Sequence, residues 1–329
     1  MKWNERIYFL VFLILCGCSS KITERNNEID AETKKEVGFL VNQIIEGFTK
    51  NEPEKILDIA TDAFKSVVEE NLTENIFGPD YPIIANKYLI IDEYCQKNLR
   101  KGVQATILSE RADDHDYILS VIPAANEIYV SIGYFDVPNI QCGFCFVFVK
   151  QNEKWLLNYL NAGILQIARK DVIDWFEEAQ KDYKEGDLCN VALKLGIIKQ
   201  ILDKNKLPFK YINERELRKK GQVMLENIRE KITFPMKIDK IETKPCITGI
   251  APRIEGDTLF PIIRYITKLD AEDTVLLERE CDNLHENIGQ LFPKIKHNTT
   301  RIYYQVFTDD SENRKEVITP VFSRTFKVE

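Results

Sequence analysis

The fold of this chain is decided by three runs, Ile128-Tyr129-Val130-Ser131-Ile132-Gly133-Tyr134, Gly143-Phe144-Cys145-Phe146-Val147-Phe148-Val149-Lys150 and Trp155-Leu156-Leu157-Asn158-Tyr159-Leu160-Asn161. The first two runs are rich in aromatic and β-branched residues, and the third carries Trp155 and Tyr159; such residues suit the pleated surface of a sheet. Pro138-Asn139 separates the first two runs, and Gln151-Asn152-Glu153 separates the last two. Both separators have turn chemistry, so the runs predict consecutive antiparallel strands.

Two amphipathic helices and three further strands precede these runs. Apolar residues recur at spacings of three and four within Ala31–Lys50, and Pro53 starts a second helical pattern that continues to about Glu70. The additional predicted strands are Tyr88–Tyr94, Val103–Ser109 and Tyr117–Ile122. Helices followed by a curved antiparallel meander predict an α+β domain over residues 33–165, in which the helices back the sheet.

The order of these elements, ending in Lys154-Trp155-Leu156-Leu157-Asn158-Tyr159, resembles the cone-shaped domains grouped with nuclear transport factor two and ketosteroid isomerase. The resemblance implies an apolar pocket between helices and sheet, in which relatives of ketosteroid isomerase place a carboxylate and a Tyr. We take Tyr134 and Asp136 as the candidate pocket pair, without carrying catalytic roles onto them. Asp136 precedes Val137-Pro138, so a surface turn is an equally good interpretation.

A helical connector is predicted over residues 166–233. Within Asp171–Asn205, the spacing of Trp175, Ala179, Tyr183 and Gly186 resembles a single tetratricopeptide-type helical hairpin. Such repeats normally need at least about three copies to form an array, so a helical linker packed on its neighbours is the favoured interpretation. A third helix is predicted from Ile212 to Ile232.

A second, smaller α+β domain is predicted over residues 234–329, in the order strand, strand, helix, strand, strand. The predicted elements are Ile238–Ile250, Leu259–Lys268, the helix Ala271–Phe292, Arg301–Thr308 and Glu316–Val328. Asp270 is expected to cap the helix. Pro320 indicates an edge strand or a bulge in the last run, because Pro cannot donate to a central ladder.

The amino terminus predicts export and lipid attachment. A charged opening and the apolar run Ile7–Leu15 are typical of a signal peptide, and the run is too short to span a membrane. Leu15-Cys16-Gly17-Cys18 resembles the lipobox of bacterial lipoproteins, which implies cleavage after Gly17 and lipid on Cys18. An ordinary cleaved signal or an uncleaved apolar start is the alternative. In the lipoprotein interpretation, residues 1–17 are removed as the signal peptide, and residues 18–32 are expected to form a flexible tether.

Composition excludes some partners. The chain is 44% apolar and 29% charged, with a net charge of −7. Loss of Lys2, Glu5 and Arg6 with the signal peptide would make this charge more negative. Nucleic acids and anionic lipid headgroups require a basic face, so neither is an expected partner.

Cys142-Gly143-Phe144-Cys145 has the spacing of a thiol redox pair, but it continues directly into a predicted strand. Positions three apart in a strand lie about 10 Å from each other on opposite faces, beyond the separation of about 7 Å that a disulfide tolerates. A thiol redox protein therefore remains only a third hypothesis. The other cysteines, Cys95, Cys189, Cys246 and Cys281, are expected to be buried small hydrophobes.

No motif predicts a metal, a cofactor or a catalytic pair. His115 lies in the acidic loop Asp113-Asp114-His115-Asp116, which lacks the calcium-binding pattern and its terminal Glu. Of the remaining histidines, His285 lies within the last predicted helix and His297 follows it. Phosphate loops, serine-nucleophile elbows and zinc-protease motifs do not occur in the sequence.

The sequence therefore predicts a bacterial lipoprotein, anchored through Cys18 and acting as a non-catalytic binding or assembly module with a protein partner in the cell envelope. The alternative is an enzyme or small-ligand carrier that uses the pocket near Tyr134 and Asp136. Ser19 follows the lipidated cysteine where an Asp would favour inner-membrane retention in enteric bacteria, so the outer membrane is the expected location in a Gram-negative cell.

Overall fold

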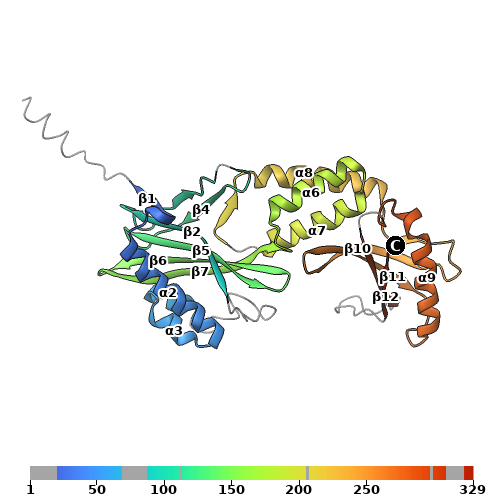
Figure 1. Ribbon diagram of the computed structural model, residues 1–329, viewed down its shortest axis with the longest axis horizontal. Helices are drawn as coiled ribbons and strands as arrows, with labels where there is room; N and C mark the ends of the chain where they lie inside the picture. Colours follow the sequence, from blue (N-terminus) through green and yellow to red (C-terminus); the bar gives the residue numbers. More distant parts are fainter. Residues whose placement is uncertain are drawn as a thin grey trace, which may run out of the picture.

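The computed structural model describes residues 21–68, 87–111, 113–204, 207–296, 299–308 and 322–328. These residues form an elongated α+β molecule with a sheet at each end and helices between them (Figure 1). The predicted fold class is confirmed. The predicted signal peptide, the lipobox with Cys18, and Pro320 lie outside the described residues. In the part of the chain that is described, no helix has both the length and the apolar character needed to cross a bilayer.

The N-terminal sheet has five antiparallel strands in the order β1-β2-β5-β6-β7. Its strands are β1 (Ile22–Arg25), β2 (Tyr88–Lys97), β5 (Ile128–Val137), β6 (Ile140–Gln151) and β7 (Lys154–Ile167). The three runs that open the sequence argument form β5, β6 and β7, and they are joined at the predicted turns. Asn152 and Glu153 both have positive φ, at 49° and 62°, as a two-residue hairpin turn requires.

Helices α2 (Ala31–Lys50), α3 (Pro53–Asp58) and α4 (Asp62–Val68) cover one face of this sheet. Asp30 caps α2 by accepting a hydrogen bond from the Thr33 amide. The second predicted helix is divided in two, because the backbone of Ile59 and Thr61 bonds to Leu157 of β7 and not to the helix. Tertiary pairing with the sheet therefore interrupts a helix that the local periodicity would continue.

The predicted tether is wrong from residue 21 onward. Ile22–Arg25 forms β1, which pairs with β2 along the edge of the sheet, and Asn26–Glu28 forms a 3-10 turn, η1. Two long-range contacts hold the segment: the Lys21 ammonium donates to the Thr106 carbonyl at 2.8 Å, and Arg25 forms a bidentate pair with Glu110. Cross-strand pairing and charged contacts hold the segment in place, and neither requires an apolar stripe. Apolar periodicity therefore could not reveal that the segment is ordered.

The prediction of one continuous meander is also wrong. Strands β3 (Ala105–Leu108) and β4 (Tyr117–Val121) form a separate small sheet with β8 (Phe209–Tyr211), in the order β3-β4-β8. The third strand comes from the connector, nearly 90 residues further along the chain, and was not predicted. The small sheet covers the face of the N-terminal sheet opposite α2, and one hydrophobic core lies between the two sheets.

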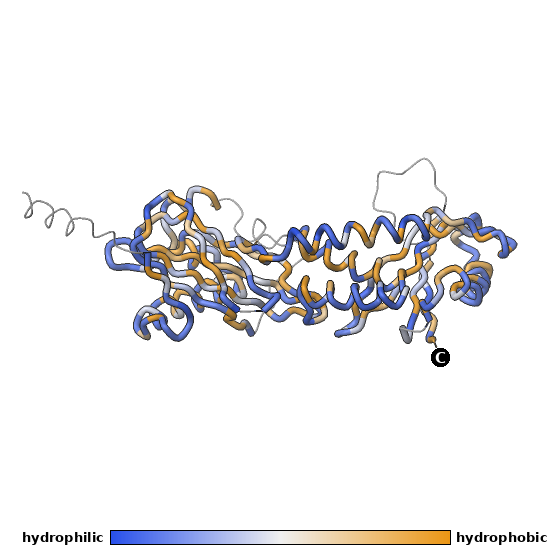
Figure 2. Tube along the Cα trace, turned by 90° about the horizontal axis from the view of Figure 1, so that it is seen from above, coloured by the Kyte–Doolittle hydropathy of each residue, from blue (hydrophilic) through white to orange (hydrophobic). Residues whose placement is uncertain are grey.

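The connector consists of α6 (Val172–Glu185), α7 (Leu188–Lys204) and α8 (Glu214–Lys231), close to the predicted spans. Gly186 ends α6 in the left-handed conformation, with φ of 75°. Helix α7 is buried on two sides: Val191 and Leu195 pack in the core of the N-terminal part, while Cys189 and Leu193 pack in the core of the C-terminal part. In Figure 2 the connector runs between the two sheet-bearing ends, with hydrophilic and hydrophobic segments alternating along its helices.

The C-terminal sheet has the order β13-β12-β11-β10-β9, with helix α9 (Thr274–Leu291) on one face. Its strands are β9 (Met236–Lys237), β10 (Cys246–Glu255), β11 (Thr258–Thr267), β12 (Arg301–Thr308) and β13 (Phe322–Lys327). The predicted order strand, strand, helix, strand, strand is confirmed for the longer elements, and the short β9 was not predicted. The first predicted strand, Ile238–Ile250, begins too early, since β10 starts at Cys246. Strand β11 pairs in parallel with β12 across the helical crossover. The predicted cap is wrong by three residues, since Asp273 and not Asp270 accepts from the Leu276 amide.

Candidate functional site

A cavity of 140 Å³ lies where the N-terminal sheet, the small sheet and the start of α6 meet. Strands β2, β5 and β7 provide one wall, and Tyr117 of β4 with Phe209 and Tyr211 of β8 provides the other. The polar groups that reach it are Asp92, Arg111, His115 and Asp171. Two of these groups, the Asp92 and Asp171 carboxylates, are buried, so we treat the cavity as the candidate site.

Asp92 enters the cavity because of a β-bulge. The register between β2 and β5 shifts between Ile90, which pairs with Gly133, and Asp92, which pairs with Ile132. Without the extra residue, Asp92 would point to the same face as Ile90, toward the helices. Asn26 of η1 stabilises the bulge, because its side-chain oxygen accepts from the Glu93 amide at 2.8 Å. The N-terminal segment therefore helps to build the site.

Asp92 is the centre of a compact polar network. It is 8% exposed and accepts a hydrogen bond from the Tyr117 hydroxyl at 2.6 Å and another from the Arg111 guanidinium at 2.5 Å. The Tyr94 and Tyr117 hydroxyls are 2.9 Å apart. Burial raises the pKa of Tyr117, and the charge of Asp92 raises it further, so Tyr117 remains a protonated donor. Asp92, Arg111, Tyr117 and Tyr94 are therefore hydrogen-bonded to one another within the protein.

His115, Asp171 and Asp174 form a second group at the edge of the same cavity. Asp171 is the N-cap of α6: its Oδ1 accepts from the amides of Ile173 and Asp174. Its Oδ2 accepts from the Tyr211 hydroxyl at 3.0 Å. His115 Nε2 lies 3.7 Å from Asp171 Oδ2 and 3.4 Å from Asp174 Oδ1. Burial raises the pKa of Asp171, and the neighbouring Asp174 carboxylate also raises it.

The structure separates the two residues predicted to line a pocket. Tyr134 lines the 140 Å³ cavity from β5, but Asp136 is exposed and lies beside a different hollow, next to Arg169 and Asp257. The carboxylates in the cavity are Asp92 and Asp171 instead. Asp136 belongs to the end of β5 that precedes the Pro138 turn, as the alternative interpretation of this position expected.

Cys142 and Cys145 lie on opposite faces of β6, as the strand period predicted. Cys142 lies in the core between the N-terminal sheet and α2, and Cys145 lies in the core between the N-terminal sheet and the small sheet. Both thiols are buried and unbonded, and burial raises the pKa of Cys142 to about 11. A high pKa leaves little thiolate at neutral pH, so this geometry does not support the thiol redox hypothesis.

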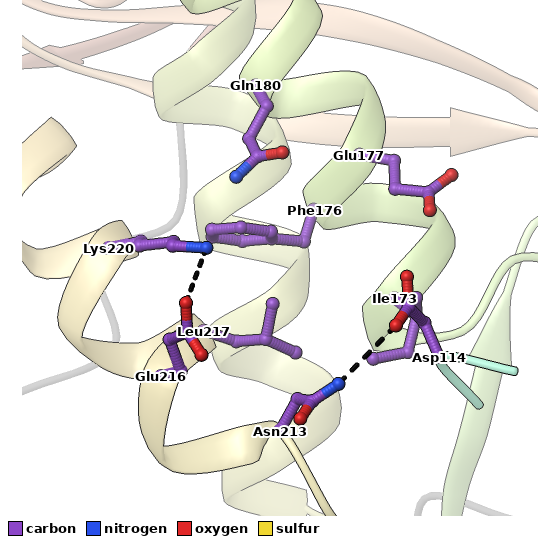
Figure 3. Close-up of a pocket in the computed structure, with 9 residues that line it drawn as sticks. All are labelled: Asp114, Ile173, Phe176, Glu177, Gln180, Asn213, Glu216, Leu217 and Lys220. Carbon is purple, nitrogen blue, oxygen red and sulfur yellow. Dashed lines mark hydrogen bonds and ion pairs between the residues drawn. The ribbon is translucent and has the colours of Figure 1, made fainter. Parts of the chain in front are cut away.

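Figure 3 shows a shallow cleft of 270 Å³ between α6 and α8. Its floor is apolar, with Phe176 at the centre, and Glu216 forms an ion pair with Lys220 at 2.7 Å on its rim. On the opposite rim the Asn213 amide approaches Asp114 Oδ1 at 3.5 Å. The contact joins the β3–β4 loop, which carries His115, to the start of α8.

The outer face of the C-terminal sheet is a second candidate surface. Among the described residues no helix covers it, because α9 packs on the other face. Arg253 lies over the ring of Tyr303 at 4.3 Å, and Arg301 lies over the ring of Phe260 at 5.8 Å. Arg264 is exposed on the same face. In an acidic protein, this face combines basic side chains with aromatic rings.

The fold and the site define a three-sheet α+β protein with a small polar cavity and an open arginine-rich sheet face. Comparisons with protein-family models, with curated proteins and with solved structures found no match. The resemblances to the cone-shaped domains and to lipoproteins therefore stay predictions.

Sequence reasoning identified Tyr134 as a pocket residue, assigned no site role to His115, and missed the other residues of the cavity. Asp171 had a usable signal, because an Asp before the helical pattern that starts at Val172 is a typical N-cap. Asp92 and Arg111 had none. Asp92 is the middle residue of a strand whose alternation is broken by the bulge, and Arg111 lies in a loop.

Proposed function

We propose that this protein is an exported, lipid-anchored module that holds a binding surface away from the membrane for a protein partner in the cell envelope. Three features support the proposal: the lipobox-like Leu15-Cys16-Gly17-Cys18, the position of the first strand, and the open face of the C-terminal sheet. Each is argued below.

The first strand limits how far the folded part can move from the lipid. Cys18 precedes Ile22, the first residue of β1, by four residues. An extended chain covers at most about 3.3–3.6 Å per residue, so β1 would start within about 14 Å of the lipidated cysteine. The N-terminal sheet would therefore stay next to the membrane, in place of the free movement that a tether of residues 18–32 would allow.

The observation that carries the proposal is the placement of the two ends. Figure 1 shows β1 at one end of the long axis and strands β10–β12 with α9 at the other. Helix α7 contributes to the hydrophobic cores of both halves, so the ends are joined by packed side chains and not by a linker. A rigid molecule anchored at β1 projects its C-terminal sheet away from the membrane.

The projected face has the composition of a protein interface. Arg and aromatic residues are enriched in such interfaces, where they supply most of the binding energy. On this face Arg253, Arg264 and Arg301 are exposed, the rings of Phe260 and Tyr303 are buried, and Glu255 pairs with Arg253 and Arg301. The excess of positive charge favours an acidic surface on the partner.

A small-ligand carrier or enzyme that uses the cavity at Tyr134 is less well supported. Ligand pockets usually measure about 300–1,000 Å³, whereas the cavity that Tyr134 lines has 140 Å³. Its central carboxylate, Asp92, is already bonded to Arg111 and Tyr117. The space suits water or an ion better than an organic substrate.

Two measurements in the native bacterium test the proposal. The Cys18→Ser variant should lose palmitate labelling and move from the membrane to the soluble exported fraction. A photo-crosslinker at Thr325, exposed on the outer face of β13, should capture a partner that one at Val275, exposed at the start of α9, does not capture.

The Arg264→Glu variant should lose the crosslink from Thr325, because the reversed charge repels an acidic partner. Continued lipid incorporation in Cys18→Ser would refute the anchor. Equal capture from Thr325 and Val275, or capture that Arg264→Glu leaves unchanged, would refute the binding face.

A further inference from the structure

The group of His115, Asp171 and Asp174 has the geometry of a metal site. The two imidazole-to-carboxylate distances are 3.4 and 3.7 Å, and all three ligand atoms lie within 4.8 Å of one another. Ligands at about 2.0–2.2 Å from a tetrahedral ion are themselves about 3.3–3.6 Å apart. Only small side-chain movements are therefore needed to place all three atoms around one ion.

The oxygens that face His115 are not the ones that cap the helix. Asp171 uses Oδ1 for the amides of α6 and turns Oδ2 toward His115, while Asp174 uses Oδ2 for the Asp171 amide and turns Oδ1 toward His115. One oxygen of each carboxylate therefore satisfies amides at the start of α6, and the other oxygen of each faces His115. Two like charges held this close repel each other, and a cation between them would remove the repulsion.

The surroundings orient the three side chains as outer-shell partners do in metal proteins. Tyr211 donates its hydroxyl proton to Asp171 Oδ2. Asp113 Oδ1 accepts from the His115 amide at 2.9 Å and lies 3.8 Å from His115 Nδ1, which directs the free Nε2 toward the carboxylates. The Asp114–Asn213 contact in Figure 3 holds the loop that carries His115.

The site also has an entrance and a free coordination position. The side chains of His115 and Asp174 are 33% and 40% exposed, so an ion can reach them from solvent. His115 and Asp171 also line the 140 Å³ cavity, which leaves room for a water molecule on the inner side. Three protein ligands with an open fourth position are the pattern of zinc and related sites that bind water or a small ligand.

We propose that His115, Asp171 and Asp174 bind one divalent transition-metal ion of the Mn²⁺ or Zn²⁺ type at the mouth of this cavity. One imidazole nitrogen and two carboxylate oxygens suit these borderline ions better than soft ions that require thiolates. The ion joins the β3–β4 loop to the start of α6 and so fixes the small sheet against the connector. The inference is independent of the lipid anchor and of the C-terminal face.

Manganese is the probe of choice because buried cysteines do not compete for it. The full-length chain in detergent micelles should remove one equivalent of Mn²⁺ from the free-ion EPR signal, and Zn²⁺ should displace it, as the general order of affinities requires. His115→Gln and Asp174→Asn should each weaken binding at least about tenfold. Asp171→Asn should do the same without unfolding α6, because Asn caps helices as well as Asp.

Matched control variants remove an imidazole or a carboxylate at positions outside the proposed metal site. His285→Gln and Asp203→Asn replace a half-buried histidine on α9 and an exposed carboxylate on α7, and both should bind Mn²⁺ like the parent. Absence of Mn²⁺ and Zn²⁺ binding by the folded parent, verified by circular dichroism, would overturn the proposal and leave only a polar contact of His115 with the two carboxylates. Binding that the three ligand variants do not weaken would also overturn it.

Discussion

At the scale of single residues, the polar network in the cavity shows how one buried carboxylate organises its neighbours. Asp92 is reached by Tyr117 and Arg111, and Tyr94 continues the chain of hydroxyls. Buried polar groups are stable only when they are bonded, and each partner here depends on the same carboxylate. Loss of Asp92 therefore costs more than one hydrogen bond.

We expect Asp92→Ala to lower the free energy of unfolding by about 2–4 kcal/mol, because it leaves a buried hydroxyl and a half-buried guanidinium without their partner. Urea denaturation followed by circular dichroism measures the change. The matched variant Glu110→Ala removes a carboxylate that pairs with Arg25 but is 60% exposed, and should lower the free energy of unfolding much less. A similar loss for both variants would contradict the central role of Asp92.

At the scale of elements, the β6–β7 hairpin places a residue in a backbone conformation that its side chain disfavours. The β6–β7 turn places Asn152 and Glu153 in the left-handed region, where Asn is tolerated but Glu is strained. Glycine is the usual second residue of this turn type. Lys150 lies 3.5 Å from Glu153, but the Glu153 side chain is 93% exposed, so this pair contributes little.

Glu153→Gly should therefore raise the free energy of unfolding by about 0.5–1 kcal/mol, through relief of the strained backbone. The same change at Glu226, an exposed position inside α8 with ordinary helical geometry, should lower it by about 0.5–1 kcal/mol. Thermal and urea melts of the two variants measure the opposite signs. A destabilising Glu153→Gly would contradict the assigned turn.

At the scale of the whole molecule, α7 is the element that makes the chain one unit. Its two buried sides belong to different hydrophobic cores, and a methyl group added at Gly196 would lie 3.7 Å from Pro252 Cδ of β10. A helix shared between two cores couples their unfolding, because neither core keeps its full burial when the helix leaves.

Leu193 of α7 packs in the core of the C-terminal part. We expect Leu193→Ala to lower the free energy of unfolding by about 2–5 kcal/mol and to lower the midpoint of a single cooperative unfolding transition. Val223→Ala on α8, where the parent side chain is 51% exposed, should have little effect. Calorimetry together with proteolysis of the two halves measures the coupling. Two separate transitions, with the N-terminal one unchanged in Leu193→Ala, would contradict it.

Much of the fold followed from local patterns. The period of Ala31–Lys50, the turn residues at Pro138 and Asn152, and the opposite faces of Cys142 and Cys145 are properties of nearby residues. Such features depend on helix and strand periods, which the sequence records directly. The candidate site was harder to predict, because only Tyr134 was named as a pocket residue, and its predicted partner Asp136 lies elsewhere.

The sequence by itself determined the α+β class, the type of most elements and the order strand, strand, helix, strand, strand of the C-terminal part. Only the tertiary structure decided that β3 and β4 pair with β8, that Ile22–Arg25 joins a sheet, and that His115 meets Asp171. The physical reason is the separation along the chain over which each feature is determined. Periodicity reflects burial within a few residues, whereas sheet partners and cavity residues are selected by packing between segments far apart in the chain.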